Sequence, residues 1–218
     1  MDLVKVFITF YKYCVGNLLN LPLKQQQITG PILITLICCL LWLFEPTASE
    51  YFALQRDLVA KGYLWQFLTA NFVHTNTTHL LLNLTGVTLL WAVHGQYYNV
   101  KIYLINIVLL SIGVTIGIYL FSNNLLWYAG LSGTLHGIFV YGAYLDIRNK
   151  VKFGWLLMFG VWLKVSYEQL YGADQMIKDL IAANVAVDAH LYGAVAGLGC
   201  IVLNLVKGNY LPQDHRGK

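Results

Sequence analysis

The sequence predicts an all-α, polytopic membrane protein built as a bundle of six transmembrane helices. Hydrophobic residues make up 58% of the 218 residues and charged residues only 11%, and the mean hydropathy is +0.60. Soluble domains carry about 25% charged residues, so this composition excludes a soluble globular protein. Six apolar segments follow one another along the chain, each close to the length of about 20 residues that spans a bilayer.

The apolar segments define the expected domain organisation. The first begins at Ile28 or Pro31 and ends at Phe44. We expect the six transmembrane helices at residues 28–44, 77–93, 101–121, 131–145, 153–171 and 188–206. Together they form one domain over residues 28–207, followed by a cytoplasmic tail at 208–218.

The N-terminal segment, residues 1–27, mixes apolar residues with Lys5, Lys12 and Lys24. A cleavable signal peptide needs an unbroken apolar run followed by small residues at the cleavage site. Lys12 interrupts the run and no such site follows it. We therefore expect an amphipathic helix lying on the cytoplasmic face of the membrane.

The positive charges give the orientation of the bundle, because cytoplasmic loops are enriched in Lys and Arg. A cytoplasmic N-terminus places most of them inside, namely Lys5, Lys12, Lys24, Lys101, Arg148, Lys150, Lys152, Lys207, Arg216 and Lys218. Only Arg56, Lys61 and Lys178 then lie outside. The long outer connection from Glu45 to Asn76 is rich in aromatic residues, so we expect it to lie in the outer membrane interface.

Cysteine usage and net charge exclude several other classes of protein. The four cysteines lie in apolar or N-terminal contexts, with no CxxC pattern and no clustered Cys/His set. Neither a disulfide framework nor a metal site is expected, and no cofactor is implied. The net charge of +4 is explained by the cytoplasmic loops of a membrane protein, so no nucleic-acid partner is predicted.

Two polar residues at the outer ends of separate segments are candidates for chemistry. Ser132 opens the fourth segment, within the stretch GLSGTLHG, and His190 opens the sixth. A serine is a weak nucleophile until a nearby base accepts its proton, and His190 is the candidate base. We interpret Ser132 and His190 as a catalytic pair inside the membrane.

Glycines next to both residues provide a way to bring them together. Gly193 and Gly197 lie on the same helical face as His190, and Gly133 offers a matching small surface beside Ser132. Small residues at such spacings let transmembrane helices approach closely. We therefore expect the fourth and sixth segments to pack against each other through these glycines.

Acyl transfer also needs hydrogen-bond donors for the oxyanion that develops on the substrate. His79 and Asn83 are four residues apart in the second segment, again at its outer end, and both can donate. The N–H of Ser132, at a helix start, is a third candidate. Asp188 lies on a different helical face from His190 and no other carboxylate is well placed, so we expect a Ser–His dyad.

These motifs resemble those of the rhomboid intramembrane serine proteases. The resemblance covers roughly residues 60–200 and rests on Gly130-Leu131-Ser132-Gly133, on His79 with Asn83, and on Ala189-His190 followed by Gly193 and Gly197. It implies a six-helix fold, Ser132 as nucleophile, His190 as base, and His79 and Asn83 as oxyanion donors. Gly130 and Gly133 would shape the nucleophile turn.

Two positions depart from the usual rhomboid pattern. Trp65-Gln66 stands where rhomboids commonly have Trp-Arg, and His136 stands where many have a tyrosine that stacks on the base. GLSGTLHG followed by Ala-His-Leu-Tyr-Gly is similar to the rhombosortase branch. That resemblance implies cleavage of Gly-Gly-containing C-terminal membrane tails of exported proteins at the periplasmic face of a bacterial inner membrane, with transfer of the acyl group to water or to an amine.

Several ionisable residues have more than one interpretation. His136 is either a ring stacked near His190 or a second acid or base, and His74 is expected to hold its loop in place. Lys164 and Glu168, four residues apart in the fifth segment, either neutralise each other or contact a substrate tail. His94 is expected to be solvated in a cytoplasmic loop.

Three alternative functions remain open on the sequence alone. The first is a general rhomboid protease that cuts single-span membrane proteins. The second is an inactive rhomboid-like protein that binds membrane helices, although both Ser132 and His190 are present. The third, a small-solute transporter, is disfavoured because the polar residues gather at one depth and do not line a path across the membrane.

Overall fold

The computed structural model describes residues 21–181 and 183–206, in which long helices dominate. Six of them correspond to the six apolar segments: α2 (Gln25–Trp42), α6 (Thr77–His94), α7 (Val100–Phe121), α8 (Ser132–Arg148), α9 (Gly154–Tyr171) and α11 (Val187–Val206). The predicted segments therefore coincide with helices to within a few residues at each end. The predicted amphipathic helix in residues 1–27 lies mostly outside the described residues, as does the tail at 208–218.

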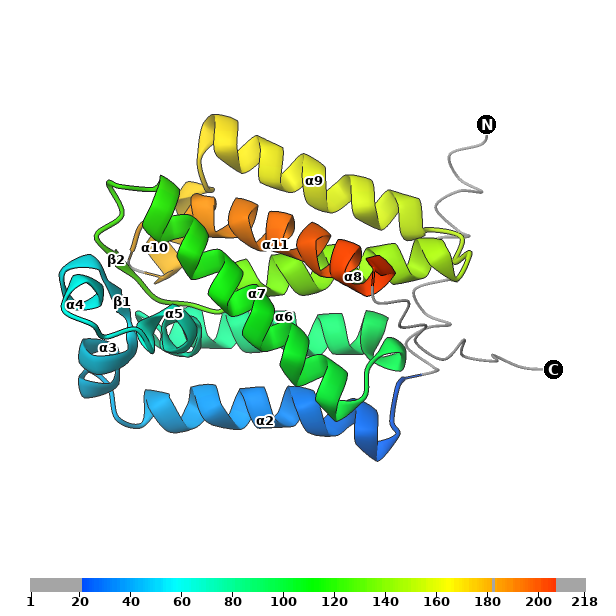
Figure 1. Cartoon of the computed structure of the whole chain (residues 1–218), viewed down its shortest axis with the longest axis horizontal. Coiled ribbons are helices and arrows are strands. Elements are labelled where there is room, and N and C mark those ends of the chain that lie inside the picture. Colours follow the sequence, from blue (N-terminus) through cyan, green and yellow to red (C-terminus); the bar gives the residue numbers. More distant parts are fainter. Residues whose placement is uncertain (1–20, 182, 207–218) are drawn as a thin grey trace.

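Short elements gather at one end of the bundle, shown at the left of Figure 1. They are α3 (Thr47–Phe52), β1 (Leu54–Gln55), α4 (Arg56–Ala60), α5 (Gln66–Thr69), the 3-10 helix η1 (Ala70–Phe72), β2 (Trp127–Tyr128) and α10 (Gln175–Ile181). A further 3-10 helix, η2 (Gly95–Tyr97), follows α6. β1 pairs antiparallel with β2, Leu54 opposite Tyr128, and so ties the long outer connection to the turn before α8.

Side chains at the helix starts explain where α6 and α7 begin. The side chain of Asn76 accepts a hydrogen bond from the His79 N–H at 2.8 Å, and Asn99 accepts one from the Ile102 N–H at 2.9 Å. Asn at this position satisfies one of the N–H groups that a helix start leaves without a partner.

Arg56 closes the opposite end of α7. Its guanidinium donates hydrogen bonds to the carbonyl oxygens of Ile118, Tyr119, Ser122 and Leu125, at 2.7 to 3.0 Å. These carbonyls lie at and beyond the C-terminal end of α7, where carbonyl groups lack partners within the helix and a cation is favoured. This role explains a positive charge on the side of the bundle where few are expected.

The helix α8 lies inside the bundle, with α7, α9 and α11 around it and α2 and α9 at opposite edges (Figure 1). Its interior position is reflected in its burial, since 11 of its 17 residues are buried. The starts of α8 and α11 lie at the end that carries β1, β2 and α10, whereas α2 begins and α11 ends at the other (Figure 1). The first residue of α8 is therefore placed beside the short elements.

The helices differ in whether their length and hydropathy suffice to cross a bilayer. Among the described residues, α2 and α7 are long and apolar enough to cross a membrane, with mean hydropathies of 1.3 and 2.3, and the apolar stretch Val187–Leu203 of α11 is shorter. The count of six transmembrane helices therefore stays a prediction. Large apolar side chains are nevertheless exposed along α9, including Trp155, Phe159 and Leu163 at 58 to 72%, as expected of a lipid-facing surface.

Candidate active site

The turn before α8 brings Ser132 to the first position of that helix. Gly130 has a φ of 128°, a conformation that side chains disfavour. A Cβ at Gly130 would also lie 2.7 Å from Cε1 of the His79 ring. The Tyr128 hydroxyl donates to the Gly130 carbonyl at 2.7 Å, and the Gly130 N–H donates to the Ala70 carbonyl at 3.0 Å. Glycine is therefore required at 130 for the turn to hold the serine in this place.

The structure brings Ser132 and His190 into contact. Ser132 Oγ lies 2.9 Å from His190 Nε2, although the two residues are 58 positions apart in the sequence. The predicted glycine packing accounts for this approach. A Cβ at Gly193 would lie 1.8 Å from the Gly133 carbonyl oxygen, and one at Gly197 would lie 2.8 Å from the Gly137 carbonyl oxygen. Any larger residue at 193 would force α8 and α11 apart.

A carboxylate completes the contacts of His190, and here the sequence-based prediction was wrong. Glu168 Oε2 lies 2.8 Å from His190 Nδ1, with side chains that are only 13% and 7% exposed. We expected a dyad because no carboxylate near His190 in the sequence shares its helical face. The acid comes instead from α9, while Asp188 Oδ2 accepts a hydrogen bond from the Ser122 hydroxyl at 2.5 Å.

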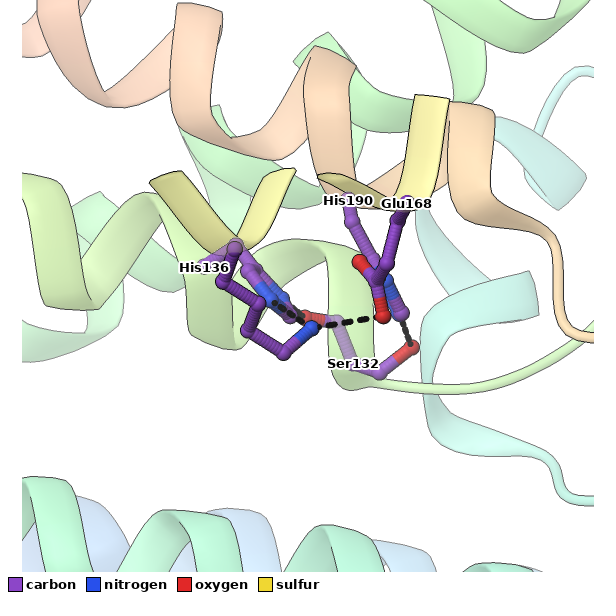
Figure 2. A network of polar contacts seen from close by, with 5 residues as sticks. Ser132, His136, Glu168 and His190 are labelled. Atoms are coloured by element: carbon purple, nitrogen blue, oxygen red, sulfur yellow. Dashed lines mark hydrogen bonds and ion pairs between the residues drawn. The ribbon is translucent and has the colours of Figure 1, made fainter. Parts of the chain in front are cut away.

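Lys164 and His136 connect this carboxylate back to the serine, and Figure 2 shows how His136, Glu168 and His190 gather around Ser132. Lys164 Nζ donates to Glu168 Oε1 at 2.8 Å and lies 3.0 Å from His136 Nε2. His136 Nδ1 is 2.7 Å from the Ser132 carbonyl oxygen. The ring of His136 is stacked on that of His190, with centroids 4.2 Å apart and planes inclined by 18°. The stacked position is thus the one that the structure gives to His136.

The two predicted oxyanion donors lie together on α6, and both are buried. His79 Nδ1 is 3.1 Å from the Thr75 hydroxyl, and the Asn83 amide donates to the His79 carbonyl at 3.0 Å. The Thr75 hydroxyl donates to the Ile181 carbonyl at 3.1 Å and the Thr75 N–H donates to His79 Nδ1 at 3.5 Å, so Nδ1 accepts and the ring proton of His79 resides on Nε2, the atom beside Gly130. His79 can then donate a hydrogen bond toward the serine turn.

A cleft of about 220 Å³ opens next to the serine and is lined by Ser132, His79 and Thr75. Its other walls are formed by residues 125 and 127–129 around β2 and by residues 181 and 183–186 at and after the end of α10. Asn83 does not line this cleft, so its predicted part as an oxyanion donor stays a prediction.

His74, in the loop before α6, is 2% exposed and packs its ring edge-on against His79, with centroids 5.2 Å apart. Burial lowers the pKa of His74 to about 3, so its ring is neutral around pH 7. These contacts fit the expected role of holding the loop. They also place a rigid neutral ring behind His79.

Three residues of the site could in principle hold a metal ion, since ligand atoms of His136, Glu168 and His190 all lie within 4.8 Å of one another. Each of these groups already has a hydrogen-bond partner. His136 Nε2 contacts Lys164, and the two nitrogens of His190 contact Glu168 and Ser132. The arrangement is therefore explained as a hydrogen-bonded network.

Sequence reasoning missed two contributors to the site, Glu168 as the partner of His190 and Thr75 as the partner of His79. The signal for Glu168 was available, because an ionisable pair inside an apolar segment needs a reason to be there. The residue that Glu168 contacts, His190, could not be identified, because periodicity alone does not say which helix packs against α9. Thr75 lies in a loop where no periodic pattern applies.

The sequence was then compared with known protein families. A family model described as the Rhomboid domain matches residues 61–206, which is more than half of the chain. Comparison with curated proteins gives no match. The matched range contains every residue of the site just described and the helices α6 to α11 that carry them. The chain therefore belongs to the rhomboid family, whose members are membrane proteins and are generally intramembrane serine proteases.

Proposed function

We propose that this protein is a serine endopeptidase that cuts membrane-anchored proteins, with Ser132 as nucleophile and His190 as general base. The observation that carries the proposal is the 2.9 Å contact between Ser132 Oγ and His190 Nε2 beside a cleft. A nucleophile and a base within hydrogen-bonding distance are the geometric requirement for acyl transfer. Membership of the rhomboid family supports the same reaction class.

The reaction begins when Ser132 Oγ attacks the carbonyl carbon of the scissile peptide bond. The hydroxyl proton moves to His190 Nε2 as the Oγ–C bond forms, and the carbonyl oxygen becomes an oxyanion. The C–N bond then breaks, and the leaving amine takes the proton from His190 Nε2. Water, or an amine, then attacks the ester carbon of the acyl-enzyme and gives a proton to His190 Nε2, the C–Oγ bond breaks, and Ser132 Oγ takes that proton as the product leaves.

The hydrogen-bond donors that we assign to the oxyanion are the N–H of Ser132 and the side chains of His79 and Asn83. The Ser132 N–H, at the first position of α8, has no acceptor within the helix. His79 lines the cleft with Ser132, and Asn83 is anchored one turn away through the His79 carbonyl. Removing a single oxyanion donor typically lowers kcat by about 100- to 1000-fold.

The substrate class that we propose is a C-terminal tail with a Gly-Gly motif, a transmembrane helix and a basic end. The support is the similarity of the motifs around Ser132, His136 and His190 to the rhombosortase branch. The cleft is consistent with this substrate, because small side chains line much of it, among them Ala129, Ala183 and Ala186. A confined cleft favours small residues next to the scissile bond.

The proposed location is a bacterial inner membrane, with the N-terminus in the cytoplasm and the cleft open to the periplasm. Arg148 ends α8 and Lys150 and Lys152 follow it, whereas Ser132 starts that helix. Positive residues mark the cytoplasmic side. The serine then lies toward the outer face, where exported proteins arrive.

The first test is labelling of the purified protein in liposomes with a fluorescent fluorophosphonate, which reacts with activated serines. Ser132→Ala and His190→Ala are each expected to lower the labelling rate by at least about a thousandfold, as for other serine hydrolases that lose one of these residues. Ser166→Ala, which alters an exposed serine of α9, is the matched control and should label like the wild type. Undiminished labelling of Ser132→Ala would refute the proposed nucleophile.

The second test uses two co-expressed reporter proteins that differ only in their tails. One tail carries Gly-Gly before a transmembrane helix and a basic end, and the other carries Val-Val at the same positions. Cleavage of the Gly-Gly reporter alone supports the proposed substrate class, whereas cleavage of both favours a general rhomboid protease. The mass of the released product distinguishes hydrolysis from transfer to an added amine.

A further inference from the structure

Glu168 of α9 contacts the base without having been assigned any part in the reaction. We propose that Glu168 is the positioning acid of the Ser132–His190 pair, and that it makes the site a Ser–His–Glu triad supplied by three helices, α8, α11 and α9. This inference rests on the proposed function of Ser132 and His190 and adds a third group to it.

Both oxygens of the Glu168 carboxylate are engaged, which fixes its plane. Oε2 faces His190 Nδ1 and Oε1 accepts from Lys164 Nζ, each at 2.8 Å. An ion pair whose two side chains are both exposed contributes little and leaves them free to move. Here Lys164 is 50% exposed but the Glu168 carboxylate only 13%, so the contacts to Lys164 and His190 together hold the carboxylate in one orientation.

The donors and acceptors around the site allow one consistent placement of the protons. Lysine only donates, so Nε2 of His136 accepts from Lys164 and the proton of His136 resides on Nδ1. That Nδ1–H donates to the Ser132 carbonyl. The chain of contacts thus starts at the serine side chain and returns to the backbone of the same residue (Figure 2).

The same reasoning fixes the state of the base. A carboxylate only accepts hydrogen bonds, so His190 Nδ1 carries a proton and donates a hydrogen bond to Glu168. His190 Nε2 therefore has a free lone pair directed at the Ser132 hydroxyl. When Nε2 takes the serine proton, the ring becomes positive next to the negative carboxylate. The proton on Nδ1 stays there, and Glu168 acts by orienting the ring and by stabilising the imidazolium.

The consequence for catalysis is that Glu168 acts on the rate of the chemical step and not on binding. In serine hydrolases with a buried aspartate behind the histidine, the isosteric amide lowers kcat by about 10⁴-fold because it favours the wrong tautomer. A carboxylate that is partly exposed is expected to contribute less, so we expect about a hundredfold.

The experiment measures fluorophosphonate inactivation as a function of probe concentration, which separates the maximal rate kinact from the apparent binding constant KI. Glu168→Gln is expected to lower kinact by about a hundredfold with KI unchanged. Glu168→Asp, which keeps the charge, should retain more of kinact than the amide. Glu50→Gln removes an exposed carboxylate of α3 and is the matched control.

Chemical rescue distinguishes a positioning acid from a structural side chain. In Glu168→Ala, added formate can occupy the vacated place beside His190, and we expect it to raise kinact in a concentration-dependent way. Formate should not change kinact of the wild type or of Ser132→Ala. The apparent Tm of every variant is measured in parallel, so that loss of folding is recognised.

Two results would overturn the inference. One is a kinact for Glu168→Gln within about threefold of the wild type. The other is a fall in kinact that parallels the fall in Tm across the Glu168 variants and that formate does not reverse in Glu168→Ala. Either outcome leaves the proposed function intact if Ser132→Ala and His190→Ala still abolish labelling. Persistent labelling of Ser132→Ala would instead remove the proposed function itself.

Discussion

Two histidine–carboxylate pairs lie at opposite ends of α8, and only one of them is next to a serine. At the start of α8, His190 contacts Glu168 at 2.8 Å. At its end, His94 Nε2 contacts Asp146 Oδ2 at 3.2 Å, and the Tyr97 hydroxyl donates to Asp146 Oδ1 at 2.6 Å. Judged by the pair alone, the two arrangements are alike.

Their surroundings differ in ways that decide what each pair can do. The side chains of His94 and Asp146 are 0% and 1% exposed, whereas those of His190 and Glu168 are 7% and 13% exposed. Gly142 leaves the space that the His94 ring fills, since a Cβ there would lie 2.4 Å from His94 Nδ1. Among the residues that the structure describes, none hydrogen-bonds to the buried His94 Nδ1, so none of them adds a nucleophile to this pair.

The comparison shows that a histidine beside a carboxylate is not by itself a sign of catalysis. The pair at the end of α8 joins α6 to α8 in the interior, and its polar atoms stabilise that packing. The pair at the start of α8 joins α9 to α11 and leaves one histidine nitrogen for a serine beside a cleft. Each pair should therefore respond differently to the loss of its acid.

The largest effect on stability is expected from Asp146→Ala. Removing one partner of a buried pair leaves the His94 donor without its acceptor and typically costs about 3–5 kcal/mol of the free energy of unfolding. The measurement is the apparent Tm in detergent, followed by tryptophan fluorescence. Kinact per folded molecule should stay within about twofold of the wild type, because this pair does not touch the serine.

Asp57→Ala, which removes an exposed carboxylate at the start of α4, serves as the control and should change stability by less than about 0.5 kcal/mol. The comparison between the two pairs would fail if Asp146→Ala lowered kinact as strongly as Glu168→Gln while leaving the Tm unchanged.

The next effect concerns the contact that brings His190 to Ser132. In Gly193→Ala the new Cβ would meet the Gly133 carbonyl oxygen at 1.8 Å, so α8 and α11 must separate. Overpacking of this kind costs about 1–3 kcal/mol, and the separation lengthens the Ser132–His190 contact. We expect a lower Tm together with a loss of fluorophosphonate labelling.

Gly199→Ala, on the same helix α11, is the matched control because a Cβ there meets nothing within 4 Å. Alanine is the better helix former by about 1 kcal/mol, so this variant should be at least as stable as the wild type. Equal behaviour of the two variants would contradict the idea that glycine contacts set the distance between nucleophile and base.

The sequence predicted most of the helices and part of the site, and the reason for each error is physical. Apolar periodicity located α6 and α7 within a residue or two because their starts carry Asn caps and their interiors are uniformly apolar. The motif spacing correctly predicted the contact between Ser132 and His190, because the glycines of α8 and those of α11 pack against each other. Both results depend on patterns within one or two segments.

The errors come from contacts between helices that the patterns do not relate. His94 was expected to be solvated, yet it is buried against Asp146, which lies 52 positions further along the chain. Glu168 was placed correctly on one face with Lys164, but periodicity does not identify the helix that this face meets. The outer connection forms short elements anchored by Arg56, each too short to leave a periodic signal, and its expected position in the outer membrane interface stays a prediction.

The smallest effect is expected at His136, where two contributions can be separated. His136→Phe keeps a ring that can stack on His190 but removes the bonds to the Ser132 carbonyl and to Lys164. Each of the two lost hydrogen bonds is worth about 0.5–1.5 kcal/mol, and only the one to the Ser132 carbonyl acts directly on the serine turn, so kinact should fall by roughly two- to tenfold.

His136→Leu removes the stacking as well, and stacked rings contribute about 0.5–1.5 kcal/mol beyond their area. Its kinact should therefore fall below that of His136→Phe, with the same probe and at equal folded fraction. Equal values for Phe and Leu would mean that the ring of His136 serves only as a hydrogen-bonding link from Lys164 to the serine turn. If both variants kept the kinact of the wild type, Glu168 alone would position His190. The pair at the start of α8 would then differ from the buried pair at its end through the adjacent serine and cleft.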